Sequence, residues 1–239
     1  MIQIAIYGAG RMAGAIVRAA ESRDDLVIVA TVGPETPDWE SPVPHLFSLP
    51  TMPALPALLI DFTLPDGTRA AAEWCAENDV ALLSGVTGLP DDVTEALQAA
   101  ADRVPVLWSP NLSVGINLLA ELAKQAAAVI DPDTPVAIED IHHQWKKDAP
   151  SGTALMLGEA IRSKRGNGAG SLEYTSIREG EEIGVHTITF KMAGEEFDLV
   201  HRAQDRSIYA VGALSAGKWL ISQPPGLYSA ADWLEGRIA

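Results

Sequence analysis

Cysteine is almost missing from this sequence, and basic residues are scarce. The only cysteine among the 239 residues is Cys75, so no disulfide can form within the chain, which is typical of a reducing compartment. Lysine and arginine total 17 against 32 aspartates and glutamates, and the formal net charge is -15 at pH 7. Because nucleic acids and anionic membranes bind clustered lysine and arginine, this charge argues against both as partners. It does not exclude a small anionic ligand, since a local cationic pocket can outweigh distant charges.

Long apolar runs are also missing. No run approaches the ~20 residues that a membrane-spanning helix needs. The first residues, MIQIAIYGAG, lead directly into a strand pattern without the basic segment of a signal peptide. We therefore expect a cytoplasmic protein. Its hydrophobic content of 47% and charged content of 21% are ordinary for a globular chain with one large or two small domains.

The first half of the chain alternates short apolar strands with helices. Between them, the proline-rich segment 33–56 predicts a loop with one poor edge strand at most. Continuous apolar strands that alternate with helices indicate a parallel, doubly wound sheet of the Rossmann-like α/β class. The predicted strands cover 2–7, 26–32, 58–62, 80–84 and 104–108, and the predicted helices cover 12–21, 68–78 and 91–102.

The pattern changes after Asn111 and indicates a second, α+β domain with a mixed or antiparallel sheet. Two of its segments alternate apolar and polar residues, as antiparallel strands with one wet face do. We predict a dinucleotide-binding domain formed by residues 1–112 and 213–239, and a second domain formed by residues 113–212. The predicted elements are helices over 116–130, 153–164 and 207–221, strands over 135–141, 186–192 and 197–202, a loop over 163–171, and a C-terminal tail with Trp219 and Trp233 that packs on the first domain.

A glycine turn, Gly8-x-Gly10-x-x-Ala13, lies between the first strand and the first helix. The first glycine permits a tight turn, and the second lets the backbone approach a pyrophosphate. The small third residue lets helix and strand pack closely, and the helix N-terminus offers free N–H groups. This position favours dinucleotide binding over the alternative of a glycine-rich turn without a ligand.

The coenzyme itself stays undecided between NADH and NADPH. An acidic residue at the end of the second strand would hold the ribose of NAD, but Thr31, Val32 and Gly33 stand there. The nearest carboxylate is Glu35, beyond Pro34, and there is no arginine for the 2′-phosphate of NADP.

The stretch EDIHHQWKKDAPSGT, residues 139–153, gathers positive and proton-carrying groups in an acidic chain. His142 and His143 follow an apolar strand at its C-terminal edge, where ligand clefts of α/β proteins open, and at most one of them can face a reacting centre. Ser151 is the expected N-cap of the next helix. Separately these residues fit strand-end packing, solvated surface and ordinary capping. Their coincidence favours a site for a carboxylate or for an anion that develops in a reaction.

This stretch closely resembles the E-x-HHxxKxDAPSGTA signature of the 4-hydroxy-tetrahydrodipicolinate reductase family. GAGRMAG, IDFTLPDG, SGVTG, SPNLSVGIN, REGEEIGVHTITF and GEEFDLVHRA extend the resemblance over nearly the whole chain. It implies NADH- or NADPH-dependent reduction of a cyclic imine dicarboxylate in lysine and diaminopimelate biosynthesis. It also implies a Rossmann domain completed by the C-terminal tail, a second domain for substrate binding and oligomerisation, and a homotetramer.

The resemblance also implies roles for individual residues. His142 would be the general acid/base and Lys146 a proton donor, because hydride addition leaves an enamine-like anion that has to be protonated. The substrate would be bound by His143, Ser151, Gly152 and Thr153, and the coenzyme by Gly8, Ala9, Gly10, Arg11, Met12, Phe62, Thr63, Gly85, Val86, Thr87, Ser109, Pro110, Asn111 and Leu112. No metal is expected, since five histidines and one cysteine give no ligand set with suitable spacing.

Some features depart from the family pattern. Val86 replaces the first threonine of the usual GTTG, Leu112 stands where an aromatic residue is common, and the proline-rich segment is unusual. Two other functions would use a similar fold. A regulatory dinucleotide-binding protein would not need a proton donor such as Lys146, and the DAPSGT segment favours the reductase over an amino-acid dehydrogenase of the same two-domain plan.

Overall fold

A computed structural model of the chain describes residues 1–165 and 170–238, and these form two compact units. Unit 1 comprises Met1–Ser113 and Ser207–Ala239, and unit 2 comprises Val114–Arg206. The predicted domains divide after residues 112 and 212, whereas helix α6 (Ser207–Leu220) belongs as a whole to unit 1.

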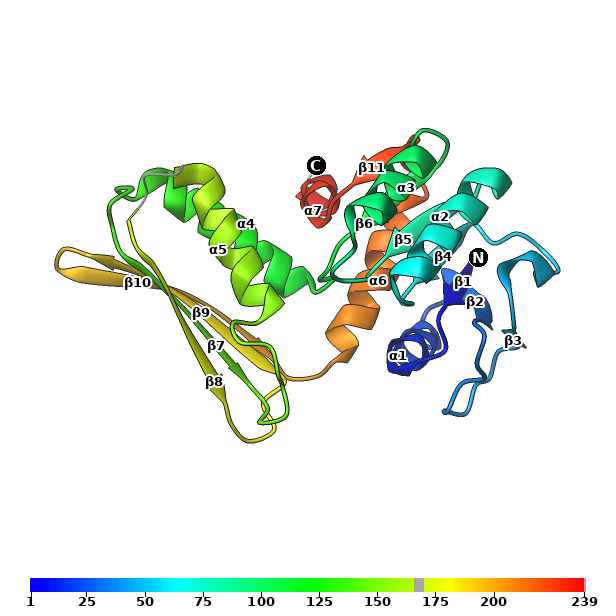
Figure 1. Cartoon of the computed structure of the whole chain (residues 1–239), viewed down its shortest axis with the longest axis horizontal. Helices are drawn as coiled ribbons and strands as arrows, with labels where there is room; N and C mark the ends of the chain where they lie inside the picture. The colour runs from blue at the N-terminus through cyan, green and yellow to red at the C-terminus, as the bar shows by residue number, and fades with distance from the viewer. Residues whose placement is uncertain (166–169, 239) are drawn as a thin grey trace. The chain divides into compact units, whose positions relative to one another are not determined.

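Unit 1 is built on a sheet of seven parallel strands in the described residues (Figure 1). The chain enters at β1 in the middle, adds β2 and β3 on one side, and then adds β4, β5 and β6 on the other. The order therefore reverses between β1 and β4, and ligands of open α/β sheets bind at such a switch point. The strands are β1 (Ile2–Tyr7), β2 (Leu26–Val32), β3 (His45–Leu46), β4 (Leu58–Asp61), β5 (Ala81–Ser84), β6 (Pro105–Trp108) and β11 (Gly226–Tyr228), in the order β11-β6-β5-β4-β1-β2-β3.

Helices cover both faces of this sheet, which is why its strands are apolar on both sides. Helices α2 (Pro65–Asn78) and α3 (Asp91–Ala101) pack on one face, while α1 (Arg11–Ala20) and α6 pack on the other. Helix α2 begins with Pro65 in its first turn, where the missing N–H costs nothing, and ends at Asp79 in the left-handed conformation.

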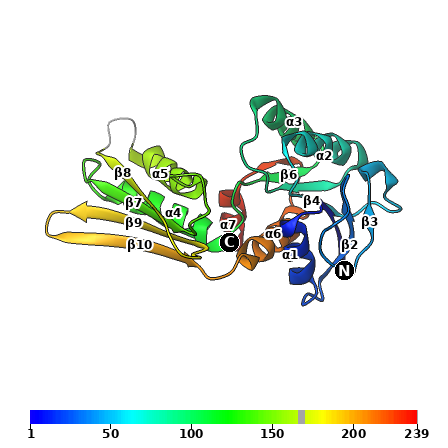
Figure 2. The same cartoon turned by 60° about the horizontal axis from the view of Figure 1, so that its bottom comes forward.

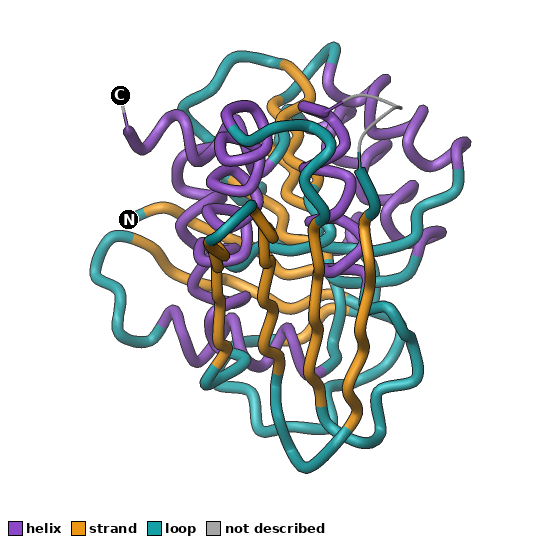
Figure 3. The backbone as a smooth tube through the Cα atoms, turned by 90° about the vertical axis from the view of Figure 1, so that its left-hand side faces the viewer, coloured by secondary structure: helices purple, strands orange, loops and turns teal. Residues whose placement is uncertain are grey.

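Unit 2 contains a mixed four-stranded sheet, and Figure 3 shows its strands side by side. Strand β7 pairs in parallel with β8 and antiparallel with β9, which forms a hairpin with β10. Helices α4 and α5 lie on the same face (Figure 2) and bury Leu157, Ile161, Ile138 and Phe190. The elements are α4 (Val114–Val129), β7 (Val136–His142), α5 (Gly152–Arg165), β8 (Leu172–Arg178), β9 (Gly184–Met192) and β10 (Glu195–Ala203).

The predicted fold class is confirmed, and the differences are local. Strand β8 was not predicted, because LEYTSIR carries few apolar residues and its parallel pairing with β7 defines it. The predicted loop over 163–171 is helical up to Arg165, and residues 166–169 lie outside the described residues.

The proline-rich segment holds only the short strand β3 and a 3-10 turn, η1 (Leu49–Thr51), as its composition indicated. The C-terminal tail packs on unit 1 as predicted, since β11 extends the sheet beside β6 and Trp233 of α7 (Ala230–Ile238) is fully buried. Among the described helices, none has the length and apolar character needed to cross a membrane.

Candidate active site

The glycine turn of unit 1 has the geometry that the sequence pattern requires. Gly8 has a φ of +123°, and a Cβ there would lie 2.9 Å from the carbonyl oxygen of Phe62. Only glycine therefore fits at this position. Gly10 is the N-cap of α1 and has no side-chain cap, and a Cβ built on it would meet nothing within 4 Å. The N-terminal N–H groups of α1 thus face open space, which suits a pyrophosphate.

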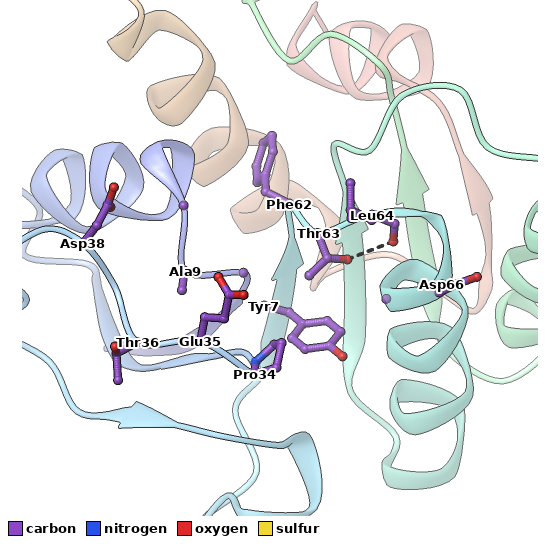
Figure 4. Close-up of a pocket in the computed structure, with 13 residues that line it drawn as sticks. Tyr7, Ala9, Pro34, Glu35, Thr36, Asp38, Phe62, Thr63, Leu64 and Asp66 are labelled. Atoms are coloured by element: carbon purple, nitrogen blue, oxygen red, sulfur yellow. Dashed lines mark hydrogen bonds between the residues drawn. The ribbon is translucent and has the colours of Figure 1, made fainter.

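A cavity of about 790 Å³ adjoins this turn at the carboxyl ends of β1, β2 and β4 (Figure 4). This is the switch point of the sheet, where the sequence pattern places a dinucleotide. The lining residues are Tyr7, Gly8, Ala9, Gly10, Pro34, Glu35, Thr36, Asp38, Phe62, Thr63, Leu64, Asp66 and Gly67.

Five predicted coenzyme residues line this cavity, and the other nine do not. Gly8, Ala9, Gly10, Phe62 and Thr63 are among the lining residues. Arg11 and Met12 open helix α1 directly after the turn. The remaining seven follow β5 and β6 at the same edge of the sheet, and they are Gly85, Val86, Thr87, Ser109, Pro110, Asn111 and Leu112.

Asp61, which sequence reasoning missed, connects the loops at this edge. Its fully buried carboxylate accepts hydrogen bonds from the Thr63 N–H at 2.9 Å and from the hydroxyls of Thr63, Thr68 and Ser84 at 2.6, 2.7 and 2.9 Å. Burial raises the pKa of Asp61, and these hydrogen bonds oppose the rise. The Ser84 hydroxyl in turn accepts the Val86 N–H at 3.4 Å. One buried side chain thus links the β4 loop, helix α2 and the β5 loop.

In unit 2, His142 is the buried histidine at the end of β7. Its Nδ1 lies 2.9 Å from Oδ1 of Asp140, which is two residues earlier and therefore on the same face of the strand. Because an ionised carboxylate can only accept, Nδ1 carries the proton and Nε2 is left with its lone pair. Burial and the charge of Lys146 lower the pKa of His142 below its ordinary value, and Asp140 only partly offsets them.

Asp140 is held in place by partners on two other elements. Arg178 of β8 pairs with its Oδ1 at 2.8 Å, the Ser176 hydroxyl donates to its Oδ2 at 2.6 Å, and the Ser151 N–H approaches Oδ2 at 3.4 Å. Burial opposes ionisation of this carboxyl group, but these donors outweigh it and hold the pKa of Asp140 below its usual range. The sequence around the histidine motif does not predict that Arg178 and Ser176 contact Asp140. Both residues belong to the unpredicted strand β8.

The start of helix α5 confirms the predicted capping by Ser151. Its hydroxyl accepts the Ala154 N–H at 3.1 Å, the usual N-cap bond to the third helical residue. A Cβ on Gly152 would meet nothing within 4 Å, so the helix start is open there. His186 of β9 approaches the Ser151 hydroxyl at 3.4 Å. Burial lowers the pKa of His186 to about 4. Thr153 occupies the first turn of the helix.

Lys146 and His143 lie in the loop that joins β7 to α5. Lys146 forms an ion pair of 2.9 Å with Asp148, and the Gly152 N–H also bonds to this carboxylate. The hydrogen bond from Lys146 is the largest cause that holds the pKa of Asp148 below its ordinary value. The side chain of His143 contacts Arg206, whose Nη2 is 3.5 Å from the Nε2 of His143. As expected for neighbours on an extended segment, only one of the two histidines joins the Asp140 cluster.

A doubly wound sheet with a glycine turn at its switch point, together with a unit that holds a buried histidine near a lysine, defines a dinucleotide-dependent oxidoreductase. The comparisons with known proteins name the family. Residues 2–112 match the family model described as "Dihydrodipicolinate reductase, N-terminus", and residues 115–234 match "Dihydrodipicolinate reductase, C-terminus". The chain belongs to the dihydrodipicolinate reductase family.

Individual relatives agree with this assignment. The chain is 40% identical over 243 residues to 4-hydroxy-tetrahydrodipicolinate reductase of Stenotrophomonas maltophilia (strain K279a), with 98% of each chain covered. It is also 40% identical over 236 residues to the protein of that name from Xanthomonas euvesicatoria pv. vesicatoria (strain 85-10), with 97% of each covered. A dipicolinate-bound dihydrodipicolinate reductase from Paenisporosarcina sp. TG-14 shares the fold, with a TM-score of 0.84, 24% identity, and coverage of 96% of this chain and 97% of that one.

Proposed function

We propose that this chain reduces 4-hydroxy-tetrahydrodipicolinate, a cyclic imine dicarboxylate, to tetrahydrodipicolinate with NADH or NADPH and with loss of the 4-hydroxyl group as water, as a step of lysine and diaminopimelate biosynthesis. One observation carries the proposal beyond family membership. The buried imidazole of His142 is oriented by Asp140, and the positive charge of Lys146 helps to lower its pKa. Both groups lie in the same unit as the open start of helix α5. Such a group of residues combines proton transfer with anion binding.

The glycine turn and its cavity fit a nicotinamide dinucleotide. Gly8, Ala9, Gly10 and the N-terminus of α1, with Arg11 and Met12, would hold the pyrophosphate, because a Cβ would obstruct the turn and the helix N–H groups are uncapped. The bound coenzyme would supply the hydride. Further contacts are proposed for Phe62, Thr63, Gly85, Val86, Thr87, Ser109, Pro110, Asn111 and Leu112.

The substrate carboxylates are assigned to the start of helix α5. Asp148 supports this, because its carboxylate accepts from both Lys146 and the Gly152 N–H and is stabilised as an anion there. A carboxylate of the substrate would find the same donors. Ser151, Gly152 and Thr153 are proposed to bind it, and His143, with Arg206 beside it, is proposed as a further contact.

Proton delivery is assigned to Lys146 and His142. Hydride addition to the conjugated cyclic imine leaves an enamine-like anion, and the ammonium group of Lys146 can donate the proton that this anion needs. At neutral pH His142 is uncharged, since its pKa is lowered, and its Nε2 can accept a proton and pass it on. Asp140 stabilises the imidazolium that forms in this exchange, because its carboxylate bonds to Nδ1.

The reaction itself is tested by following oxidation of NADH and of NADPH with substrate generated enzymatically in the same vessel. We expect substrate-dependent loss of reduced-nicotinamide absorbance with at least one coenzyme. If a coenzyme binds and neither is oxidised, the proposed reaction is wrong.

The role of Lys146 is tested by Lys146→Ala, with Lys147→Ala as its matched control. The neighbouring lysine is exposed, whereas Lys146 is partly buried in its pair with Asp148. Loss of a charge-assisted donor should lower kcat at least ~100-fold and leave coenzyme affinity nearly unchanged. Lys147→Ala should behave like the parent protein. Equal activities of the two variants would contradict the assignment.

We further propose a cytoplasmic homotetramer. The resemblance over the whole chain supports the assembly, and the single cysteine supports the compartment. Light scattering coupled to size exclusion should give a mass about four times the 25.4 kDa of one chain. A monomeric mass at assay concentrations would contradict the assembly.

A further inference from the structure

The rim of the nucleotide cavity carries a feature that bears on the choice of coenzyme. In Rossmann folds an acidic residue at the end of the second strand accepts hydrogen bonds from the ribose of NAD, and an arginine nearby accommodates the 2′-phosphate of NADP. Strand β2 ends at Val32, and Gly33 and Pro34 follow, so the strand end itself carries neither group.

The chain after β2 is fixed to the strand end by His45. Its Nδ1 lies 3.0 Å from the Thr31 hydroxyl and its Nε2 lies 3.1 Å from the Gly33 carbonyl oxygen. The Gly33 N–H donates to the Leu46 carbonyl at 2.9 Å, and β3 pairs with β2 in parallel. This edge therefore keeps a defined backbone path despite its high proline content.

Trp39 attaches the same segment to the glycine turn. Its Nε1 donates to the Ala9 carbonyl at 2.9 Å, and its ring lies against Gly14 of α1, where a Cβ would be 3.0 Å away. Residues 34–38 are thus held at both ends, by His45 at the strand and by Trp39 at the turn. They cross the rim of the cavity beside the turn, and Glu35 and Asp38 are among the lining residues (Figure 4).

The charge of the cavity lining has one sign only. Glu35, Asp38 and Asp66 line it, and none of the thirteen described lining residues is lysine, arginine or histidine. Carboxylates accept hydrogen bonds from ribose hydroxyls. A 2′-phosphate carries about -1.5 to -2 charges at pH 7 and would be repelled by the same groups. Arg11 opens α1 next to the turn but is not a lining residue.

We propose that Glu35, displaced past the strand end and fixed there by the anchored segment, is the ribose-binding carboxylate of this chain, and that Glu35 and Asp38 make it selective for NADH over NADPH. The inference rests on the proposed function only in that the ligand is a nicotinamide dinucleotide. It assigns the missing acidic position to a residue that ordinary spacing would not select.

Calorimetric titration of the protein with NADH and with NADPH, without substrate, tests this directly. The parent protein should bind NADH at least ~10-fold more tightly than NADPH. Glu35→Gln should weaken NADH binding ~10-fold, as expected for loss of a hydrogen bond to a charged group. It should leave NADPH binding unchanged or stronger, so that the two dissociation constants approach each other. Glu40→Gln, an exposed glutamate of the same segment outside the lining, is the matched control and should change neither.

Results that contradict the role of Glu35 can be told apart from a failure of the proposed reduction. Equal or tighter binding of NADPH by the parent protein would overturn the proposal, and loss of that binding in Arg11→Ala would identify the cation responsible. An unchanged NADH to NADPH ratio in Glu35→Gln would overturn it as well. Selective NADH binding that depends on Glu35 supports it even if no turnover of the cyclic substrate is found, because binding is measured without that substrate.

Discussion

At the scale of single residues, Asp140 decides what His142 can do. The carboxylate fixes the proton on Nδ1 and leaves Nε2 available, while Arg178 and Ser176 hold the carboxylate in place. Asp140 is therefore a positioning residue. It also raises the pKa of His142, which burial lowers. The chemistry of the histidine motif depends on a residue outside its two histidines and lysine.

Asp140→Asn should lower kcat/KM and change its pH dependence. Because neutral His142 is the form that accepts the proton, activity should fall as pH drops through its pKa, which lies below the ordinary value. Without the Asp140 charge this pKa drops further, so the acidic limb of the profile should move to lower pH. The profile is measured between about pH 5 and pH 8, across the range in which histidine titrates.

Asp140→Glu keeps the charge and should restore part of the activity and of the profile. Coenzyme affinity serves as the control for folding, because the coenzyme cavity belongs to the other unit. A fall in activity with an unmoved profile would mean that Asp140 has a purely structural role.

At the scale of elements, the loops after β4 and β5 are held together by one buried carboxylate. Asp61 accepts four hydrogen bonds, and every donor lies in or beside these loops. Parallel strands end at one edge of the sheet, so their loops gather there, but the order of strands alone does not fix loop conformation. The hydrogen bonds to Asp61 fix the conformation of these loops.

Asp61→Asn should destabilise unit 1 and weaken coenzyme binding. The neutral amide removes the charged acceptor and turns one acceptor oxygen into a donor, so the surrounding hydroxyls and the Thr63 N–H lose their carboxylate partner. Loss of a hydrogen bond to a charged group costs about 1.5–3 kcal/mol. Urea denaturation should show this loss, and titration with NADH should show weaker binding than in the parent protein.

Asp102→Asn, an exposed residue at the end of α3, is the control and should change neither quantity. Unaltered stability and coenzyme affinity in Asp61→Asn would show that the network does not order the loops.

At the scale of the whole molecule, the predicted coenzyme site and the predicted substrate site lie in different units. The glycine turn and its cavity lie within unit 1, and the Asp140 cluster and the start of α5 lie within unit 2. Each ligand should therefore stabilise its own unit by mass action.

Hydrogen exchange, measured with each ligand separately, tests whether each ligand stabilises only its own unit. NADH at 100 times its dissociation constant should add about 2.7 kcal/mol of protection, concentrated in residues 1–113 and 207–238. Dipicolinate, as an analogue of the proposed substrate, should protect residues 114–165 and 170–206. If NADH alone protects unit 2 as strongly as unit 1, the separation of the two sites is wrong.

Much of this organisation could be predicted from local sequence. The alternation of apolar strands and helices predicts the Rossmann-like sheet, and the place of Ser151 before a helix predicts the N-cap that the structure shows. The strand β8 escaped prediction because its residues are mostly polar, and with it Ser176 and Arg178 were missed.

Local sequence accounts for the features that depend on neighbouring residues. The glycine turn, the histidine and lysine stretch and the cap of α5 each arise within a few residues, because backbone conformation and helix capping are local properties. Tertiary structure decided which distant groups meet. Asp61 meets Ser84, Asp140 meets Arg178, and Glu35 reaches the cavity of Gly8 only through strand order, register and the anchoring of a loop, none of which local periodicity encodes.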